Sequence, residues 1–222
     1  MEGRAKKMLT ENLTNNEVEL CGKIDSELSY SHEVYGEGFY QFFLDVPRLS
    51  DISDRINITI SERLLQSINI NIGDTVCVTG QFRSYNNYSE SGNRLILTVF
   101  ARDITTDWEN NKNPNHIFLN GFLCKKPVYR TTPFGREITD ILVAVNRAYN
   151  KSDYIPCIAW GRNARFSSAL EVGENIKIWG RIQSREYQKK IDEANIITKT
   201  AYEISISKME ISSKSDIQFE II

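Results

Sequence analysis

Apolar and polar residues alternate along several short stretches of this chain, which predicts β-strands as its main elements. The first stretch places Val18, Leu20 and Ile24 on one side, with polar residues between them. Segments 42–46 and 56–60 show the same period of two. Because one face of each strand is polar, we expect sheets that bury only one face.

The pattern occurs twice, at an offset of 99 residues. Asn16–Gly22 returns as Asn115–Gly121. Further matched pairs are Gly36/Gly135, Val46/Val145, Arg48/Arg147, Asp54/Asp153, Arg63/Arg162 and, one residue later, Gly73/Gly173, Gly80/Gly180 and Ser84/Ser184. A period near 100 residues is the size of a small domain, so the repeat predicts two similar domains in tandem.

Each copy predicts the order strand, loop, strand, turn, strand, short helix, strand, hairpin, strand. The helices are expected at residues 62–68 and 163–170, the fourth strands at 75–84 and 175–185, and the fifth at 94–101 and 201–207. Five short strands with one helix after the third is the order of an OB-fold, a small barrel that binds oligonucleotides. The predicted class is therefore all-β, with two tandem OB-fold five-stranded barrels.

The predicted organisation follows from the repeat and from composition. A segment rich in Asn and charged residues and closed by Pro114 separates the copies, as a linker would. The predicted parts are a flexible N-terminal segment 1–14, a first OB-fold 15–105, a linker 106–114, a second OB-fold 115–208 and a C-terminal tail 209–222.

Charge is distributed unevenly between the copies. The chain has a net charge of −2. Residues 1–114 hold 11 Lys and Arg against 17 Asp and Glu, a net −6, whereas residues 115–190 hold 13 against 6, a net +7, and residues 191–222 hold 3 against 6, a net −3. Phosphate attraction depends on local positive charge, so the second copy is the one expected to meet a polyanion.

Composition excludes several other classes. The four cysteines lack any Cys-x-x-Cys pair and the chain has two histidines, so we expect buried reduced thiols rather than a zinc site. His32 and His116 lack matching acid and nucleophile motifs, so no catalytic residue, metal or cofactor is expected and the protein is not expected to be an enzyme. Without a membrane-length apolar run or a signal-type start, we expect a cytoplasmic, nucleoid-associated protein.

Side-chain parity separates the two faces of the second barrel. On its third strand Ile155, Cys157 and Ala159 continue the core, which turns Tyr154, Ile158 and Trp160 outward. The residues expected to face outward on its fourth strand are Lys177, Trp179, Arg181, Gln183, Arg185 and Tyr187. Outward aromatic rings among arginines suit stacking of unpaired bases and pairing with phosphates. Cover by a loop, a tail or another subunit is the structural alternative.

The second copy resembles the bacterial single-stranded DNA-binding protein family over about residues 115–190. The resemblance rests on the ordered motifs Asn115-x-Ile117-x-Leu119-x-Gly121-x-Leu123, Pro127-x-x-Arg130-Thr131 in a loop, Ala144-Val145-Asn146-Arg147, Asp153-Tyr154-Ile155-x-Cys157-x-x-Trp160-x-Arg162-x-Ala164 and Gly180-Arg181-Ile182-x-Ser184-Arg185-x-Tyr187. It implies base stacking by Tyr149, Tyr154, Trp160 and Tyr187. It also implies basic contacts by Arg147, Arg181, Arg185, Lys189 and Lys190, with a solvated turn as the alternative for the two lysines.

The first copy departs from that chemistry. It holds Ser50, Arg55, Ser61 and Asn87 where the second copy has the four aromatic residues. A secondary DNA contact would involve Arg48, Arg55, Arg83, Tyr85 and Tyr88. A scaffold role, a dimer interface and a peptide site are the alternatives for this copy.

The leading hypothesis is a non-catalytic, largely sequence-independent binder of single-stranded DNA in replication, recombination or repair. The alternatives are a protein-interaction scaffold of a primosome or mobile-element replication complex, and a binder of single-stranded RNA. The family resemblance implies a homodimer with four OB-folds and makes replication or repair proteins possible partners. Members of the family usually carry a long linker and an acidic tip, which the end of this chain does not reproduce.

Overall fold

The computed structural model describes residues 15–48, 50–89, 92–106, 115–190 and 196–212. The predicted segment 1–14, nearly all of the predicted linker and most of the predicted tail lie outside these ranges. Among the described residues no helix is long and apolar enough to cross a membrane.

The first half of the chain folds into one barrel. Its elements are β1 (Asn16–Ile24), β2 (Ser29–Val34), β3 (Glu37–Pro47), β4 (Ser53–Ser61), α2 (Glu62–Gln66), β5 (Thr75–Ser89) and β6 (Gly92–Thr105). The strands are joined in the order β3-β4-β6-β5-β1, and a further pairing of β1 with β3 closes the barrel. The inward side chains predicted from alternation, among them Leu20, Ile56 and Ile58, are fully buried.

The second half repeats this architecture. Its elements are β7 (Asn115–Leu123), β8 (Val128–Thr131), β9 (Glu137–Arg147), β10 (Lys151–Trp160), α3 (Arg162–Ser167), β11 (Asn175–Lys190) and β12 (Ile196–Ile211). The pairing of β7 with β9 closes this barrel. Strand β12 runs beyond residue 208, where the second domain was predicted to end. The prediction of an all-β fold with one short helix per barrel is confirmed.

Glycines repeated between the copies stand where two strands approach closely. A Cβ on Gly22 would lie 2.3 Å from the carbonyl oxygen of Asp45, and one on Gly121 would lie 2.5 Å from that of Ala144. No side chain fits at such distances, so the strands cross at these points only because glycine is present. The same requirement in both barrels explains why the repeat kept these residues.

Two strands were missed by the sequence prediction. β2 pairs with β3, and β8 pairs with β9, in segments that were expected to be loops, including the Pro127 to Thr131 motif. All of the described residues of β8 are exposed. Since these strands bury little, their sequences lack a clear alternation, and pairing with a long neighbour supplies their order.

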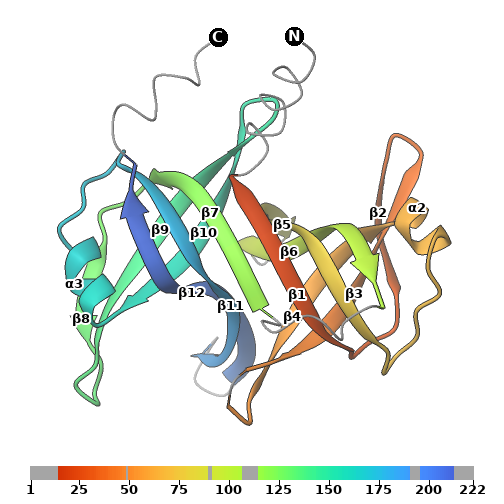
Figure 1. Ribbon diagram of the computed structural model, residues 1–222, viewed down its shortest axis with the longest axis horizontal. Helices are drawn as coiled ribbons and strands as arrows, with labels where there is room; N and C mark the ends of the chain where they lie inside the picture. The colour runs from red at the N-terminus through yellow and green to blue at the C-terminus, as the bar shows by residue number, and fades with distance from the viewer. Residues whose placement is uncertain (1–14, 49, 90–91, 107–114, 191–195, 213–222) are drawn as a thin grey trace.

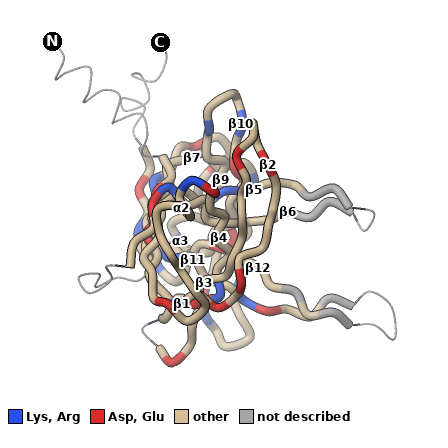
Figure 2. The backbone as a smooth tube through the Cα atoms, turned by 90° about the vertical axis from the view of Figure 1, so that its right-hand side faces the viewer, with Lys and Arg blue, Asp and Glu red and all other residues tan. Residues whose placement is uncertain are grey.

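The two barrels form one continuous sheet. Strands β1 and β7 lie side by side at the centre of the molecule and pair antiparallel from Asn16↔Leu119 to Leu20↔Asn115 (Figure 1). Hairpins β5–β6 and β11–β12, whose described parts leave the body on one side, come from different barrels (Figure 2). The pairing places corresponding strands of the two copies about an approximate twofold axis.

Matching asparagines at the starts of β1 and β7, the two strands that join the barrels, bind each strand to its own barrel. The Nδ2 of Asn16 donates to the carbonyl of Phe82 at 2.7 Å, and the amide of Phe82 donates back to the Oδ1 of Asn16 at 2.9 Å. Asn115 makes the same pair of bonds with Ile182, at 2.7 and 2.9 Å. Both asparagines are buried, so these bonds satisfy groups that water cannot reach.

Two of the cysteines depart from the expectation of reduced thiols. Cys21 on β1 and Cys77 on β5 form a disulfide, because antiparallel pairing sets them directly opposite each other with Cα atoms 4.1 Å apart. Cys124 and Cys157 are free. Burial raises the pKa of both free thiols, so neither is activated as a nucleophile.

Candidate nucleic-acid interface

β10, which the sequence predicted as the third strand of the second barrel, separates core from surface as predicted at five of six positions, Cys157 among them. Ile155 and Ala159 are fully buried, whereas Tyr154 is 47% exposed and Trp160 is 37% exposed. Ile158, predicted to face outward with them, is buried, so that prediction is wrong. β10 pairs with β12 at this residue to close the barrel, which places Ile158 at the seam.

Tyr149 lies at the turn between β9 and β10. Its φ is 62° and that of Asn150 is 53°, both in the left-handed region that residues with a Cβ rarely adopt. Pairing of Arg147 with Lys151 on the two strands holds the turn, and the hydroxyl of Ser152 donates to the Oδ1 of Asn146 at 3.2 Å. The fixed turn leaves the Tyr149 ring 93% exposed, which is an unusual position for a structural aromatic.

β11, which the sequence predicted as the fourth strand, adds an aromatic ring and a cation. The guanidinium of Arg185 lies 6.0 Å from the ring centroid of Tyr187, and both side chains are exposed. Two neighbours behave differently from the prediction. Trp179 is half-buried and packs against Phe118 at 5.1 Å, while Gln183 is buried and donates to the Oε1 of Glu203 at 2.7 Å. The side chains of Lys189 and Lys190 lie outside the described part of β11.

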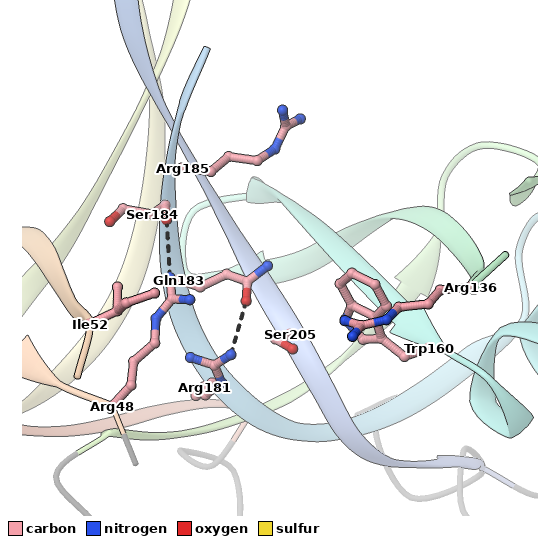
Figure 3. A pocket seen from close by; sticks show the side chains of 9 residues that line it. All are labelled: Arg48, Ile52, Arg136, Trp160, Arg181, Gln183, Ser184, Arg185 and Ser205. Atoms are coloured by element: carbon pink, nitrogen blue, oxygen red, sulfur yellow. Dashed lines mark hydrogen bonds between the residues drawn. The ribbon is translucent and has the colours of Figure 1, made fainter. Parts of the chain in front are cut away.

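A pocket of about 640 Å³ brings several of these side chains together with the first barrel (Figure 3). Its lining comprises Arg48, Ile52, Arg136, Trp160, Arg181, Gln183, Ser184, Arg185 and Ser205. Four of the nine are arginines, and Trp160 and Arg136 stand together at one end (Figure 3). A concave surface with one indole and several guanidinium groups suits a planar, anionic ligand segment.

Arginines at this pocket also surround a buried carboxylate. Asp54 is fully buried and accepts from the Nη2 of Arg48 at 2.6 Å and from the backbone amide of Ser184 at 2.7 Å. The Nη1 of Arg181 lies 3.6 Å from its other oxygen. Asp54 and Arg48 belong to the first barrel and the other two to the second, so this carboxylate ties the barrels together.

Asp153 repeats the arrangement with the barrels exchanged. It is fully buried and accepts from the amide of Ser84 at 2.7 Å, while Arg147 and Arg83 lie 3.5 and 3.8 Å away. The hydroxyl of Ser84 in turn accepts from the amide of Tyr154 at 2.7 Å. Four arginines that were predicted to contact DNA therefore also form ion pairs between or beside the barrels: Arg48, Arg83, Arg147 and Arg181. The repeat had matched the aspartates and the serines, but these ion pairs were not predicted.

Burial sets the direction of several pKa values at this junction. It raises the pKa of Asp153, opposed by the amide of Ser84 and by the charges of Arg147 and Arg83. It lowers the pKa of Arg83 and of Arg181. The pKa of Arg48 is raised by its hydrogen bond to Asp54. All four guanidinium groups are partly exposed, so each can hold an aspartate and still meet solvent.

The corresponding face of the first barrel is closed to stacking at these positions. Arg55 stands where Tyr154 stands in the second barrel, lies 3.8 Å over the Phe43 ring and bonds to Asp25. Ser61, the counterpart of Trp160, is buried and accepts from the amide of Leu64 at the start of α2. Tyr85 is exposed, and its hydroxyl accepts from Gln41 at 3.2 Å. The side chain of Tyr88 lies outside the described residues.

Within the described ranges no three or more His, Cys, Asp or Glu side chains gather as metal ligands would. Arg136 is the pocket arginine that was not predicted from the sequence, because it follows Gly135 in a turn rather than standing on a strand.

Comparison with known proteins agrees with the assignment of the second barrel. Residues 114–212 match the Single-strand binding protein family. A single-stranded DNA-binding protein of Clostridium tetani is 36% identical over 83 residues, which is 34% of this chain and 57% of that protein. Single-stranded DNA-binding protein A of Bacillus subtilis is 30% identical over 96 residues, 40% of this chain and 56% of that protein. The chain thus spans about half the length of these curated relatives.

A solved structure covers both barrels. The single-stranded DNA binding protein from Thermus aquaticus superposes with a TM-score of 0.72 over 90% of this chain and 93% of that protein, at 18% identity. At this identity the likeness concerns the fold, which is a tandem pair of OB-folds. This chain is a tandem OB-fold protein, and its residues 114–212 match the Single-strand binding protein family.

Proposed function

We propose that this protein binds single-stranded DNA without catalysis and with little dependence on sequence, mainly through its second barrel. The observation that carries the proposal is the row of exposed rings at Tyr149, Tyr154 and Trp160 along one hairpin, with Tyr187 on β11. Base stacking on such rings contributes about 1–3 kcal/mol per base and tolerates any sequence.

Arginines beside these rings support the same proposal. Arg181 and Arg185 line the pocket that contains Trp160, and Arg147 lies at the start of the turn that presents Tyr149. The region that holds them has a net charge of +7. Their charges would replace condensed counterions on the phosphates, which makes binding sensitive to salt.

A titration of the full chain with oligo(dT), followed by quenching of tryptophan fluorescence, tests the proposal. We expect tight binding at low salt, with log K falling linearly as log salt rises, and a much weaker signal with duplex DNA of the same length. Oligo(U) in parallel distinguishes RNA from DNA. Equal binding of duplex, or no binding of oligo(dT), would contradict the proposal.

A second candidate concerns the first barrel alone, which we propose as a scaffold surface for a replication or repair protein. It is favoured by the acidic balance of residues 1–114 and by Arg55 and Ser61, which are engaged with Asp25 and α2. By analogy with the family we further propose a homodimer that presents four barrels. Light scattering that gives a clean monomer would exclude this assembly.

A further inference from the structure

The hairpin between β8 and β9 ends in an exposed aromatic ring that the interface described above does not include. Phe134 is 92% exposed, and no ring contact involves it among the described residues. Most phenylalanines lie in the core, whereas this ring is held in solvent, where a ligand can cover it.

The turn that carries Phe134 is well ordered by hydrogen bonds. The amide of Gly135 donates to the carbonyl of Thr132 at 2.9 Å, and the amide of Thr132 donates to the carbonyl of Arg136 at 2.8 Å. The hydroxyl of Thr132 also accepts from the amide of Arg136 at 3.0 Å. With Pro133 second in the turn and Gly135 at φ 74°, the backbone is fixed, and the ring loses little entropy when a ligand covers it.

The surroundings of the ring favour a nucleic acid. Arg136, two residues along the turn, lines the pocket beside Trp160 (Figure 3), and among the described residues no carboxylate pairs with its guanidinium. A phosphate held by Arg136 would lie beside Trp160, and Phe134 stands two residues away in the same turn. In single-strand grooves successive bases stack on successive aromatic rings.

The first barrel offers the same hairpin with the opposite charge. Tyr35 precedes Gly36, as Phe134 precedes Gly135, and is fully exposed with φ 52°. The residue after the glycine is Glu37 in place of Arg136, and Glu33 lies on the other strand. Glu37 and Glu33 would repel a phosphate at this turn, and the nearby Arg63 is already paired with Glu37 at 3.9 Å.

We propose that Phe134 is an additional base-stacking residue, which extends the single-strand path beyond Trp160 with Arg136 on the adjoining phosphate, and that Tyr35 does not share this role. The proposal rests on the proposed binding of single-stranded DNA by the second barrel. It assigns a nucleic-acid ligand to one of two hairpin turns that the repeat makes equivalent, and not to the other.

Oligo(dT) titrations of the full-length variants Phe134→Ala, Phe134→Tyr and Tyr35→Ala test it, with Trp160→Ala as reference. We expect Phe134→Ala to lower the association constant about 5- to 150-fold, the range for loss of one stacked base. Phe134→Tyr keeps a ring and should retain binding. Tyr35→Ala, matched in turn position and exposure, should change the constant less than twofold. Each substitution is on a solvent-exposed side chain, so circular dichroism should show an intact fold.

The outcomes distinguish the proposed role of Phe134 from the proposed binding of single-stranded DNA by the chain as a whole. Wild-type affinity in Phe134→Ala together with a loss in Trp160→Ala would overturn the role of Phe134 and leave DNA binding standing. An equal loss in Phe134→Ala and Tyr35→Ala would overturn the assignment by charge. No binding of oligo(dT) by the wild-type chain would be a failure of the proposed function itself.

Discussion

The two barrels share a backbone and a junction but differ in the side chains on the outer face of the third strand. β10 presents Tyr154 and Trp160, whereas β4 presents Arg55, already engaged by Asp25 and Phe43, and a buried Ser61. The buried core and the glycines at strand crossings are the same in kind. The difference teaches that the two copies kept the residues that close a barrel and join it to its partner, while the exposed positions proposed to bind DNA differ.

The largest expected effect concerns Asp54 and Asp153, the matching aspartates that are buried where the two barrels meet. Asp54→Ala and Asp153→Ala should each lower the free energy of unfolding by about 3–5 kcal/mol, because each leaves two arginines and a serine amide without their buried partner. Urea denaturation measures both. Similar losses would show that the junction is symmetric in energy as well as geometry, and a loss under 1 kcal/mol in either would contradict this.

The next largest effect concerns the Cys21–Cys77 disulfide, which has no counterpart at the matching positions of the second barrel. Reducing the Cys21–Cys77 disulfide, or replacing both residues with serine, should cost about 2–4 kcal/mol of stability. In the second barrel the matching strand pair is Asn120 and Lys177, which cannot be cross-linked. Denaturation with and without reductant measures the loss. Cys124→Ser is the control, which should remain as sensitive to reductant as the wild-type protein.

Equivalent positions on the third strands test the proposed division of labour. Tyr154→Ala should weaken oligo(dT) binding by about 1–3 kcal/mol, as removal of a stacking ring does. Arg55→Ala at the matching position should change it by less than 0.5 kcal/mol, because its guanidinium is engaged by Asp25 and Phe43. Fluorescence titration compares them, and a larger loss in Arg55→Ala would reverse the assignment of the binding barrel.

The smallest effect is a dependence on pH. Burial raises the pKa of Asp153 in the folded chain above its ordinary value of 3.8. The part of the stability that arises from this shift is therefore complete below pH 3.8 and is lost as the pH rises through the folded pKa. Asp153→Asn lacks this titration. We expect its free energy of unfolding, relative to wild type, to increase as the pH rises from 3.8 through that value, and a flat difference would contradict the direction.

Much of the fold followed from the sequence, because alternation of residues such as Ile56 and Ile58 is imposed by burial on one face. Other features depended on pairing between distant strands. The register that sets Cys21 against Cys77 and the seam that covers Ile158 are properties of the closed barrel, so alternation within one strand does not contain them. Asp54 and Asp153 were visible as repeated residues, but a lone aspartate usually lies at the surface, and only the junction explains their burial.

The exposure of two rings of the candidate interface could be predicted from the sequence because they stand on a strand. Tyr154 and Trp160 follow from parity along β10, whereas Phe134 and Arg136 stand in a turn, where no period relates one residue to the next. The ion pairs of Arg48 and Arg147 could not be predicted either, since the opposite barrel contributes to the surroundings of each partner carboxylate.

The antiparallel pairing of β1 with β7 has a consequence for behaviour on dilution. Because both strands belong to one polypeptide, their association is intramolecular, and its effective concentration is fixed by the chain rather than by the amount of protein present. Two barrels on separate chains would part at low concentration, whereas these remain neighbours. Each basic second barrel is therefore always accompanied by one acidic first barrel, because the two are synthesised as one chain.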